Sequence, residues 1–195
     1  MNIASTHDKL ILIGLGANLP GADGASPIET LDAALVELER LGVGVVRRSR
    51  WFRSAPVPKS EQSWYFNGVA VVAFDDQPQN LLKIMQRVEK KFGRIRRTRN
   101  EARILDLDIL AFGDLVLVTS ETSATPGLAL PHPELQKRAF VLVPMADVVV
   151  NWRHPVSRQS LDEMIACLPP GQLIEPLIEP EIDPAKIESP DVQLC

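Results

Sequence analysis

The feature that most constrains the fold is the run Arg103-Ile-Leu-Asp-Leu-Asp-Ile-Leu110, which reads as a β-strand. Side chains two positions apart leave the same face of a strand, so Asp106 and Asp108 are predicted to point the same way. Leu105, Leu107 and Ile109 would then face a hydrophobic core. The two aspartates would be roughly 6–7 Å apart at the backbone, which is twice the rise of a strand.

Two carboxylates on one half-buried face repel each other and are costly to desolvate. One interpretation is that they hold Mg²⁺, which prefers oxygen ligands and often shares them with substrate phosphates. The alternative is a polar face that meets solvent or pairs with arginines. The metal interpretation is favoured by a cluster of arginines just upstream, since basic groups beside a carboxylate pair suit a polyphosphate with Mg²⁺. These arginines are Arg94, Arg96, Arg97, Arg99 and Arg103.

Composition narrows the class of protein. The chain has 195 residues and a formal net charge of −4, so any anion site must come from a local cluster of basic residues. Two scattered cysteines, Cys167 and Cys195, make neither a disulfide framework nor a zinc site. The N-terminal residues are polar and no apolar run reaches membrane-spanning length. We therefore expect a cytoplasmic protein that binds neither nucleic acid nor membrane.

The order of the expected elements indicates an α+β fold. Strands are predicted at 10–15, 43–52, 64–74 and 103–110, and helices at 26–41 and 78–92. This is the ferredoxin-like βαββαβ plan, an antiparallel sheet with both helices on one face. Further helices at 140–147 and 161–168 would cover the other face, giving α/β/α layers.

The expected domain organisation is simple. We predict a polar tail at 1–9, one domain at 10–168, and a proline- and acid-rich C-terminal tail at 169–195. The last segment has little apolar surface to bury, so we expect it to be extended or disordered. Residues 53–63 form a loop long enough to be a binding loop or a lid.

Several motifs follow one another along this order. They are Gly16-Ala-Asn-Leu19, Phe52-Arg-Ser-Ala-Pro56, Tyr65-Phe-Asn67, Glu89, Gly93-Arg-Ile-Arg96, Arg103–Leu110, Leu130-Pro-His-Pro133 and Arg138–Pro144. Together they resemble the motifs of the 6-hydroxymethyl-7,8-dihydropterin pyrophosphokinase family, in the family's order, from about Leu10 to Trp152. The D-L-D-I strand, the P-H-P segment and the R-A-F-V-L-x-P segment are together very specific.

The resemblance implies transfer of pyrophosphate from ATP to the hydroxymethyl group of a dihydropterin, with release of AMP. It implies two Mg²⁺ ions held by Asp106 and Asp108, with Arg94 and Arg103 as further catalytic residues. The implied nucleotide contacts are Gln86, Glu89, Arg96, Ile109, His132 and Arg138. The implied pterin contacts are Ser54, Ala55, Val57, Tyr65, Asn67 and Phe140.

Some questions stay open at this level. The stretch Arg99–Ala102 lacks the tryptophan and proline that this arginine loop often carries in the family. An inactive homologue that binds pterin or nucleotide, and a two-metal nucleotidyl transferase with a palm-like fold, are the alternatives. An RNA-binding module of similar fold would need exposed aromatic residues and a basic face, which the sequence lacks. The sequence does not decide between a monomer and a dimer.

Overall fold

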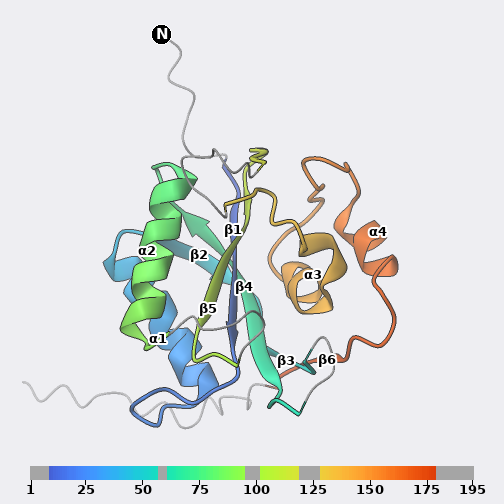
Figure 1. Cartoon of the computed structure of the whole chain (residues 1–195). Helices are drawn as coiled ribbons and strands as arrows, with labels where there is room; N and C mark the ends of the chain where they lie inside the picture. Colours follow the sequence, from blue (N-terminus) through green and yellow to red (C-terminus); the bar gives the residue numbers. More distant parts are fainter. Residues whose placement is uncertain (1–8, 57–60, 95–101, 119–127, 179–195) are drawn as a thin grey trace, which may run out of the picture.

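A central antiparallel sheet with helices on both faces organises the molecule (Figure 1). The computed structural model describes residues 9–56, 61–94, 102–118 and 128–178. Helices α1 (Pro27–Arg40) and α2 (Pro78–Lys91) cover one face, and α3 (Ala139–Met145) and α4 (Leu161–Ala166) lie on the other. The predicted α+β class and the α/β/α layering are therefore confirmed. Within the described ranges, no helix combines the length and apolar character needed to cross a bilayer.

The sheet contains six strands in the spatial order β5-β1-β4-β3-β6, with β2 also paired to β4. Their bounds are β1 Ile11–Ala17, β2 Gly44–Arg48, β3 Phe52–Ser54, β4 Tyr65–Ala73, β5 Asp106–Phe112 and β6 Ile174–Pro176. A short 3₁₀ helix, Leu135–Lys137, precedes α3. The central strand pairs are β1 with β4 and β1 with β5, both antiparallel. The order βαββαβ read from the sequence therefore places the strand that carries the aspartates beside β1.

The strand predicted at 43–52 is wrong in its continuity, because the structure divides it into β2 and β3. Ser49 binds both polar backbone groups of Val69: its N–H donates to the Val69 carbonyl (2.8 Å) and its Oγ accepts the Val69 N–H (3.0 Å). Trp51 then lies against Gly68, where an added Cβ would come within 2.4 Å of the indole ring. The chain thus bends so that a large buried indole can fit beside a glycine.

The C-terminal segment also differs from expectation. Residues 174–176 are extended, but they are hydrogen-bonded to β3 as a sixth strand. The sheet therefore includes residues beyond Leu168, where we expected the domain to end. The expected tail at 1–9, except Lys9, and residues 179–195 lie outside the described part of the chain.

Two hydrophobic cores flank the sheet, and β5 contributes to both. Leu105, Leu107 and Ile109 pack in the core shared with α1 and α2, as the alternation predicts. Leu110 packs in the other core, with residues of α3 and α4. A register shift between β1 and β5 falls at Leu12/Ile13. The strand itself begins at Asp106 rather than Arg103, so the two aspartates lie at its start.

Glu37 joins the two helices of the first layer. Its side chain is 6% exposed, and its carboxylate binds Arg40 on α1 (2.7 Å) and Lys91 on α2 (2.8 Å). The hydrogen bond from Arg40, followed by that from Lys91, lowers the pKa of Glu37 to about 2. Because the folded-state pKa lies below the ordinary value of 4.5, this carboxylate contributes stability above that value. The contribution is lost as pH falls from about 4.5 towards 2.

We predict that Glu37→Gln lowers the free energy of unfolding at pH 7, and that its difference from wild type narrows as the pH falls below about 4.5. Urea denaturation across this pH range measures the difference. Glu39→Gln is the matched control, since Glu39 is an exposed residue of the same helix. A deficit that does not change with pH would contradict the assignment of the stabilisation to the charged carboxylate.

Candidate active site

Gly16 of β1 lies on the face of the sheet that carries α3, between two polar side chains of the neighbouring strands. Gly16 lies opposite Asn67 of β4 on one side and opposite Asp106 of β5 on the other. Directly opposed residues of antiparallel strands project from the same face, so Asn67 and Asp106 flank this glycine. An added Cβ at Gly16 would lie 3.3 Å from Asn67 Oδ1 and 3.9 Å from the Cβ of Asp106. Because Gly16 has no side chain, none stands between the Asn67 amide and the Asp106 carboxylate.

The two aspartates lie on this face, as the strand pattern predicts, but they differ in their partners. Asp106 Oδ1 is 2.7 Å from Arg94 Nη2, and its Oδ2 forms an ion pair with Arg103. Asp108 Oδ2 lies 4.0 Å from His132 Nε2, and 42% of the Asp108 side chain is exposed. The arginine-pairing alternative is thus what the structure shows at Asp106. Asp108 faces a more open environment.

The electrostatics of Asp108 reflect this asymmetry. Desolvation, and then the negative charge of Asp106, raise the pKa of Asp108, whereas the charges of Arg138 and Arg94, and of His132 when it is protonated, act to lower it. A raised pKa means that the charged form is held at a cost, which a cation bound nearby would relieve. The carboxylate pair therefore favours positive charge at this face.

His132 is held as a neutral donor beside Asp108. Burial lowers the pKa of His132, although Asp108 opposes the shift. Its Nδ1 accepts the backbone N–H of Glu134 at 3.2 Å. A neutral imidazole with Nδ1 as acceptor carries its proton on Nε2, which is the nitrogen that faces Asp108. An oxyanion near Asp108 would meet an N–H donor there.

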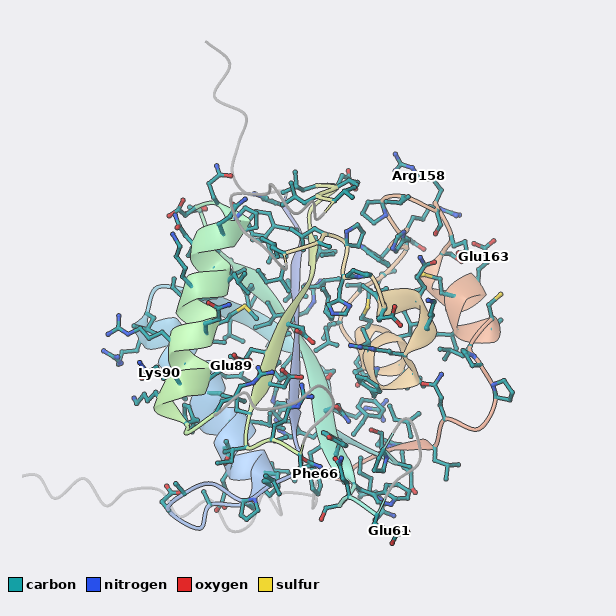
Figure 2. All side chains as sticks on the ribbon, viewed as in Figure 1. Glu61, Phe66, Glu89, Lys90, Arg158 and Glu163 are labelled. Atoms are coloured by element: carbon teal, nitrogen blue, oxygen red, sulfur yellow. The ribbon has the colours of Figure 1, made fainter. Side chains whose placement is uncertain are left out.

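Glu89 of α2 binds Arg94 and the start of β5 from the face of the sheet that carries α1 and α2. It is 3% exposed, and Figure 2 shows it on the side of α2 that faces β5, whereas Lys90 points outwards. Its Oε1 accepts the backbone N–H of Leu107 at 2.8 Å and forms an ion pair with Arg94. The sequence places Glu89 among the nucleotide contacts, and the structure brings it to Arg94 and to the start of β5.

The side chains of two other expected nucleotide contacts, Gln86 and Ile109, do not point to this site. Gln86 is exposed on α2, and the Ile109 side chain is buried in the first core. Only the backbone of Ile109 could therefore meet a ligand. Arg138 lies at the start of α3, with its guanidinium 5.6 Å from the centre of the Phe140 ring. Arg96 and Val57 lie outside the described residues, as does most of the arginine loop.

The expected pterin residues converge on the other side of Gly16. Asn67 donates from Nδ2 to Ser54 Oγ at 2.8 Å, and both side chains are buried. Tyr65 shares the face of Asn67, and its hydroxyl donates to Gln62 at 2.8 Å. Burial raises the pKa of Tyr65; the charge of Arg103 acts to lower this pKa, and the charge of Asp106 acts to raise it. Phe140 is half-buried at the edge of the second core, and the Ala55 N–H donates to the Leu173 carbonyl (3.1 Å).

Asn18 lies in the Gly16–Leu19 motif, but the sequence did not predict it to be a site residue. It is 4% exposed, and its Oδ1 accepts the Arg103 N–H at 2.7 Å while its own N–H donates to the Arg103 carbonyl. Its Nδ2 donates to the Ser63 carbonyl at 3.3 Å. Asn18 therefore joins Arg103 to the loop before β4. In the sequence, the signal for this role is that Asn18 is a polar residue directly after a buried strand.

The oxygen donors of this face fit a metal only in part. Within the described ranges, His, Cys, Asp and Glu do not form groups of three or more that could hold an ion. Two carboxylates fit Mg²⁺, which keeps several waters and takes its remaining ligands from substrate phosphates. The residues therefore suit a metal that arrives with a phosphate ligand rather than one enclosed by protein.

Comparisons with known proteins agree with this geometry. The model of the family 7,8-dihydro-6-hydroxymethylpterin-pyrophosphokinase (HPPK) matches residues 12–150. The 2-amino-4-hydroxy-6-hydroxymethyldihydropteridine pyrophosphokinase of Pseudomonas aeruginosa is 38% identical over 158 residues, covering 80% of this chain and 91% of the relative. The enzyme of the same name from Synechocystis is 34% identical over 155 residues, covering 79% and 73%.

A solved structure shares the fold. The Plasmodium falciparum HPPK-DHPS structure with SDX-DHP aligns with a TM-score of 0.62 at 14% identity, covering 82% of this chain. This chain spans 44% of the length of that one, and the low identity makes this a likeness of fold alone. The family match over residues 12–150 and the coverage of the curated relatives carry the assignment. The chain belongs to the 7,8-dihydro-6-hydroxymethylpterin-pyrophosphokinase family and is an ATP-dependent pyrophosphokinase of folate biosynthesis.

Proposed function

We propose that this protein transfers pyrophosphate from ATP to the hydroxymethyl oxygen of 6-hydroxymethyl-7,8-dihydropterin and releases AMP. The observation that carries this proposal is the row Asn67–Gly16–Asp106 across three neighbouring strands. It brings an amide that can read a heterocycle edge next to a carboxylate that can hold a phosphate-bound cation. The reacting hydroxymethyl group would lie over Gly16, between the two.

The pterin would bind on the side of β3 and β4. A flat heteroaromatic ring with an amide-like edge requires aromatic faces and a side chain that both donates and accepts hydrogen bonds. Tyr65 and Phe140 would supply the faces, and Asn67, oriented by its hydrogen bond to Ser54, would read the edge. The backbone at Ala55 and Val57 would complete the pocket.

The triphosphate would bind on the side of β5. Arg94, Arg96, Arg103 and Arg138 would hold phosphate oxygens, for which the guanidinium fork is suited. His132 would donate from Nε2. The bond that breaks joins the α-phosphate to the β-phosphorus, and the hydroxymethyl oxygen forms the new bond to that phosphorus. Positioning and charge neutralisation supply most of the catalysis in such transfers.

Asp106 and Asp108 would hold two Mg²⁺ ions. When bound, Mg²⁺ neutralises phosphate charge and makes a coordinated hydroxyl easier to deprotonate. The ion pairs at Asp106 imply that Arg94 and Arg103 act in two positions. Without ligands they neutralise Asp106, and with the nucleotide present they would turn to its phosphates. Glu89 and Asn18, which bind Arg94 and the Arg103 backbone, would limit how far the arginines travel.

We predict that Asp108→Asn abolishes AMP release, with a loss of at least about a hundredfold, because the charge that stabilises the reacting phosphates is gone. Its melting temperature should equal or exceed that of wild type, since the raised pKa shows that the native state holds this charge at a cost. The measurement is a coupled assay for AMP, with and without the hydroxymethyl dihydropterin, alongside thermal melting.

Asp114→Asn is the matched control, because it makes the same change at an exposed turn after β5. Near-normal turnover by Asp108→Asn would remove the metal assignment. Wild-type protein that releases no AMP on addition of the pterin would instead point to an inactive binding homologue.

We predict that Arg94→Ala binds Mn²⁺, used as a probe for Mg²⁺, about three- to tenfold more tightly than wild type when no nucleotide is present. The reason is that a competing cation has been removed from Asp106. Mn²⁺ titration followed by electron paramagnetic resonance measures this affinity. Arg87→Ala, at an exposed position of α2, is the control. Equal or weaker Mn²⁺ binding by Arg94→Ala would show that the arginine does not compete with the metal.

Gly16→Ala should raise the KM for the pterin by about tenfold or more while changing the melting temperature little, because the methyl group would lie 3.3 Å from Asn67 Oδ1, where the hydroxymethyl group is proposed to bind. Gly44→Ala is the control, since a Cβ there meets only Ala73, at ordinary contact distances of 3.7–3.8 Å. Steady-state kinetics at saturating ATP give the KM. An unchanged KM would place the substrate away from this row.

A further inference from the structure

The segment Gln172–Leu177 joins two walls of the proposed pterin site that are far apart in the sequence. On one side it pairs with β3: Leu173 accepts the Ala55 N–H at 3.1 Å, and the Leu177 N–H donates to the Trp51 carbonyl at 2.8 Å. On the other side it reaches the start of α3 through the side chain of Gln172. Figure 1 shows this segment running from α4 to β6 beneath α3.

The Gln172 amide binds the backbone on both sides of Arg138. Its Oε1 accepts the Ala139 N–H at 2.9 Å, and its Nε2 donates to the Lys137 carbonyl at 2.8 Å. A planar amide that makes both contacts fixes the direction of the chain as it enters the helix. Both hydrogen bonds are within the normal range, and the side chain is only partly exposed.

The start of α3 lacks a cap of its own. Arg138 occupies the N-cap position, and its side chain makes no capping hydrogen bond. The first N–H groups of a helix have no partner within the helix, so one of them must be satisfied from elsewhere. Gln172, 33 residues after Ala139 in the sequence, supplies that acceptor.

Two residues of the proposed site depend on this turn. Arg138 lies between the two backbone groups that Gln172 binds, and Phe140 follows one residue after Ala139. The guanidinium of Arg138 lies 5.6 Å from the centre of the Phe140 ring, so the two side chains are arranged together. The backbone held by Gln172 therefore sets where the Phe140 ring stands relative to β3.

We propose that Gln172 is a positioning residue for the pterin, which it serves by holding the Arg138–Phe140 turn at a fixed distance from the Ser54–Ala55 strand. The inference rests on the proposed function, because it assumes that the pterin lies against Phe140. Gln172 acts through the backbone of α3 and has no role in the phosphoryl chemistry itself.

The test is a double-mutant cycle on pterin affinity with four proteins: wild type, Gln172→Ala, Phe140→Leu and the double variant. Calorimetry would measure the Kd of 6-hydroxymethyl-7,8-dihydropterin in the presence of Mg²⁺ and α,β-methylene ATP, which cannot be cleaved at the reacting bond. Gln172→Ala should raise the Kd about three- to tenfold. In the Phe140→Leu background the same change should alter the Kd by less than about twofold, because the ring that Gln172 positions is absent.

Two further variants sharpen the result. Gln172→Glu retains an acceptor for the Ala139 N–H but sets a carboxylate oxygen against the Lys137 carbonyl, so its Kd should lie between those of wild type and Gln172→Ala. Glu175→Gln is the matched control, because it breaks the exposed ion pair between Glu175 of β6 and Arg53 of β3 (2.9 Å) without touching α3. This variant should bind pterin like wild type.

An unchanged Kd for Gln172→Ala, even with a lowered melting temperature, would overturn the proposal and leave Gln172 a purely structural residue. An equal loss in both backgrounds would also overturn it, since Gln172 would not be acting through Phe140. If wild type itself bound no pterin and released no AMP, the proposed function would fail first and the positioning role with it.

Discussion

The arrangement of this protein depends on how two like charges are tolerated at the start of β5, the strand at one edge of the sheet. Asp106 and Asp108 leave the same face of β5, and neither can move away without turning Leu107 out of the first core. Asp106 is neutralised by Arg94 and Arg103, whereas Asp108 keeps a raised pKa. Asp108 thus leaves a carboxylate without a close ion pair among the described residues at one edge of the sheet, which is why we propose that edge as the site for cations and for the phosphates that carry them.

Buried polar residues of neighbouring elements hold the aspartates and their arginines in place. Glu89 reaches from α2 to the Leu107 N–H and to Arg94, so the first helical layer fixes the register of the strand and one of its arginines together. Asn18 holds the backbone of Arg103 from the end of β1. Gly16 lies between Asp106 and Asn67, so the proposed pterin side and the proposed phosphate side are separated by a single strand of the sheet. These contacts come from α2, β1, β4 and β5, so the proposed site depends on elements that are far apart in the sequence.

Much of this could be predicted from local patterns. The period of two along Leu105–Ile109 predicted the face of the aspartates, and the helix predicted from residue 26 begins there in the structure, with Ser26 as the N-cap of α1. What local patterns could not give are contacts set by packing at long range. Trp51 breaks a strand because Gly68 lies opposite it, and β6 forms because its backbone finds a partner in β3. Glu89 and Gln172 look like ordinary polar residues until the fold brings their backbone partners to them.

Arg94 and Arg103 are therefore proposed to be counter-ions that change partners when the nucleotide binds. The most direct measurement is a crystal structure of the complex with Mg²⁺, α,β-methylene ATP and the hydroxymethyl pterin. We predict metal density on Asp106 and Asp108, with the guanidinium groups of Arg94 and Arg103 on phosphate oxygens and beyond ion-pair distance of Asp106. A ternary complex in which both arginines still bind Asp106, and in which neither aspartate touches a metal, would contradict this prediction.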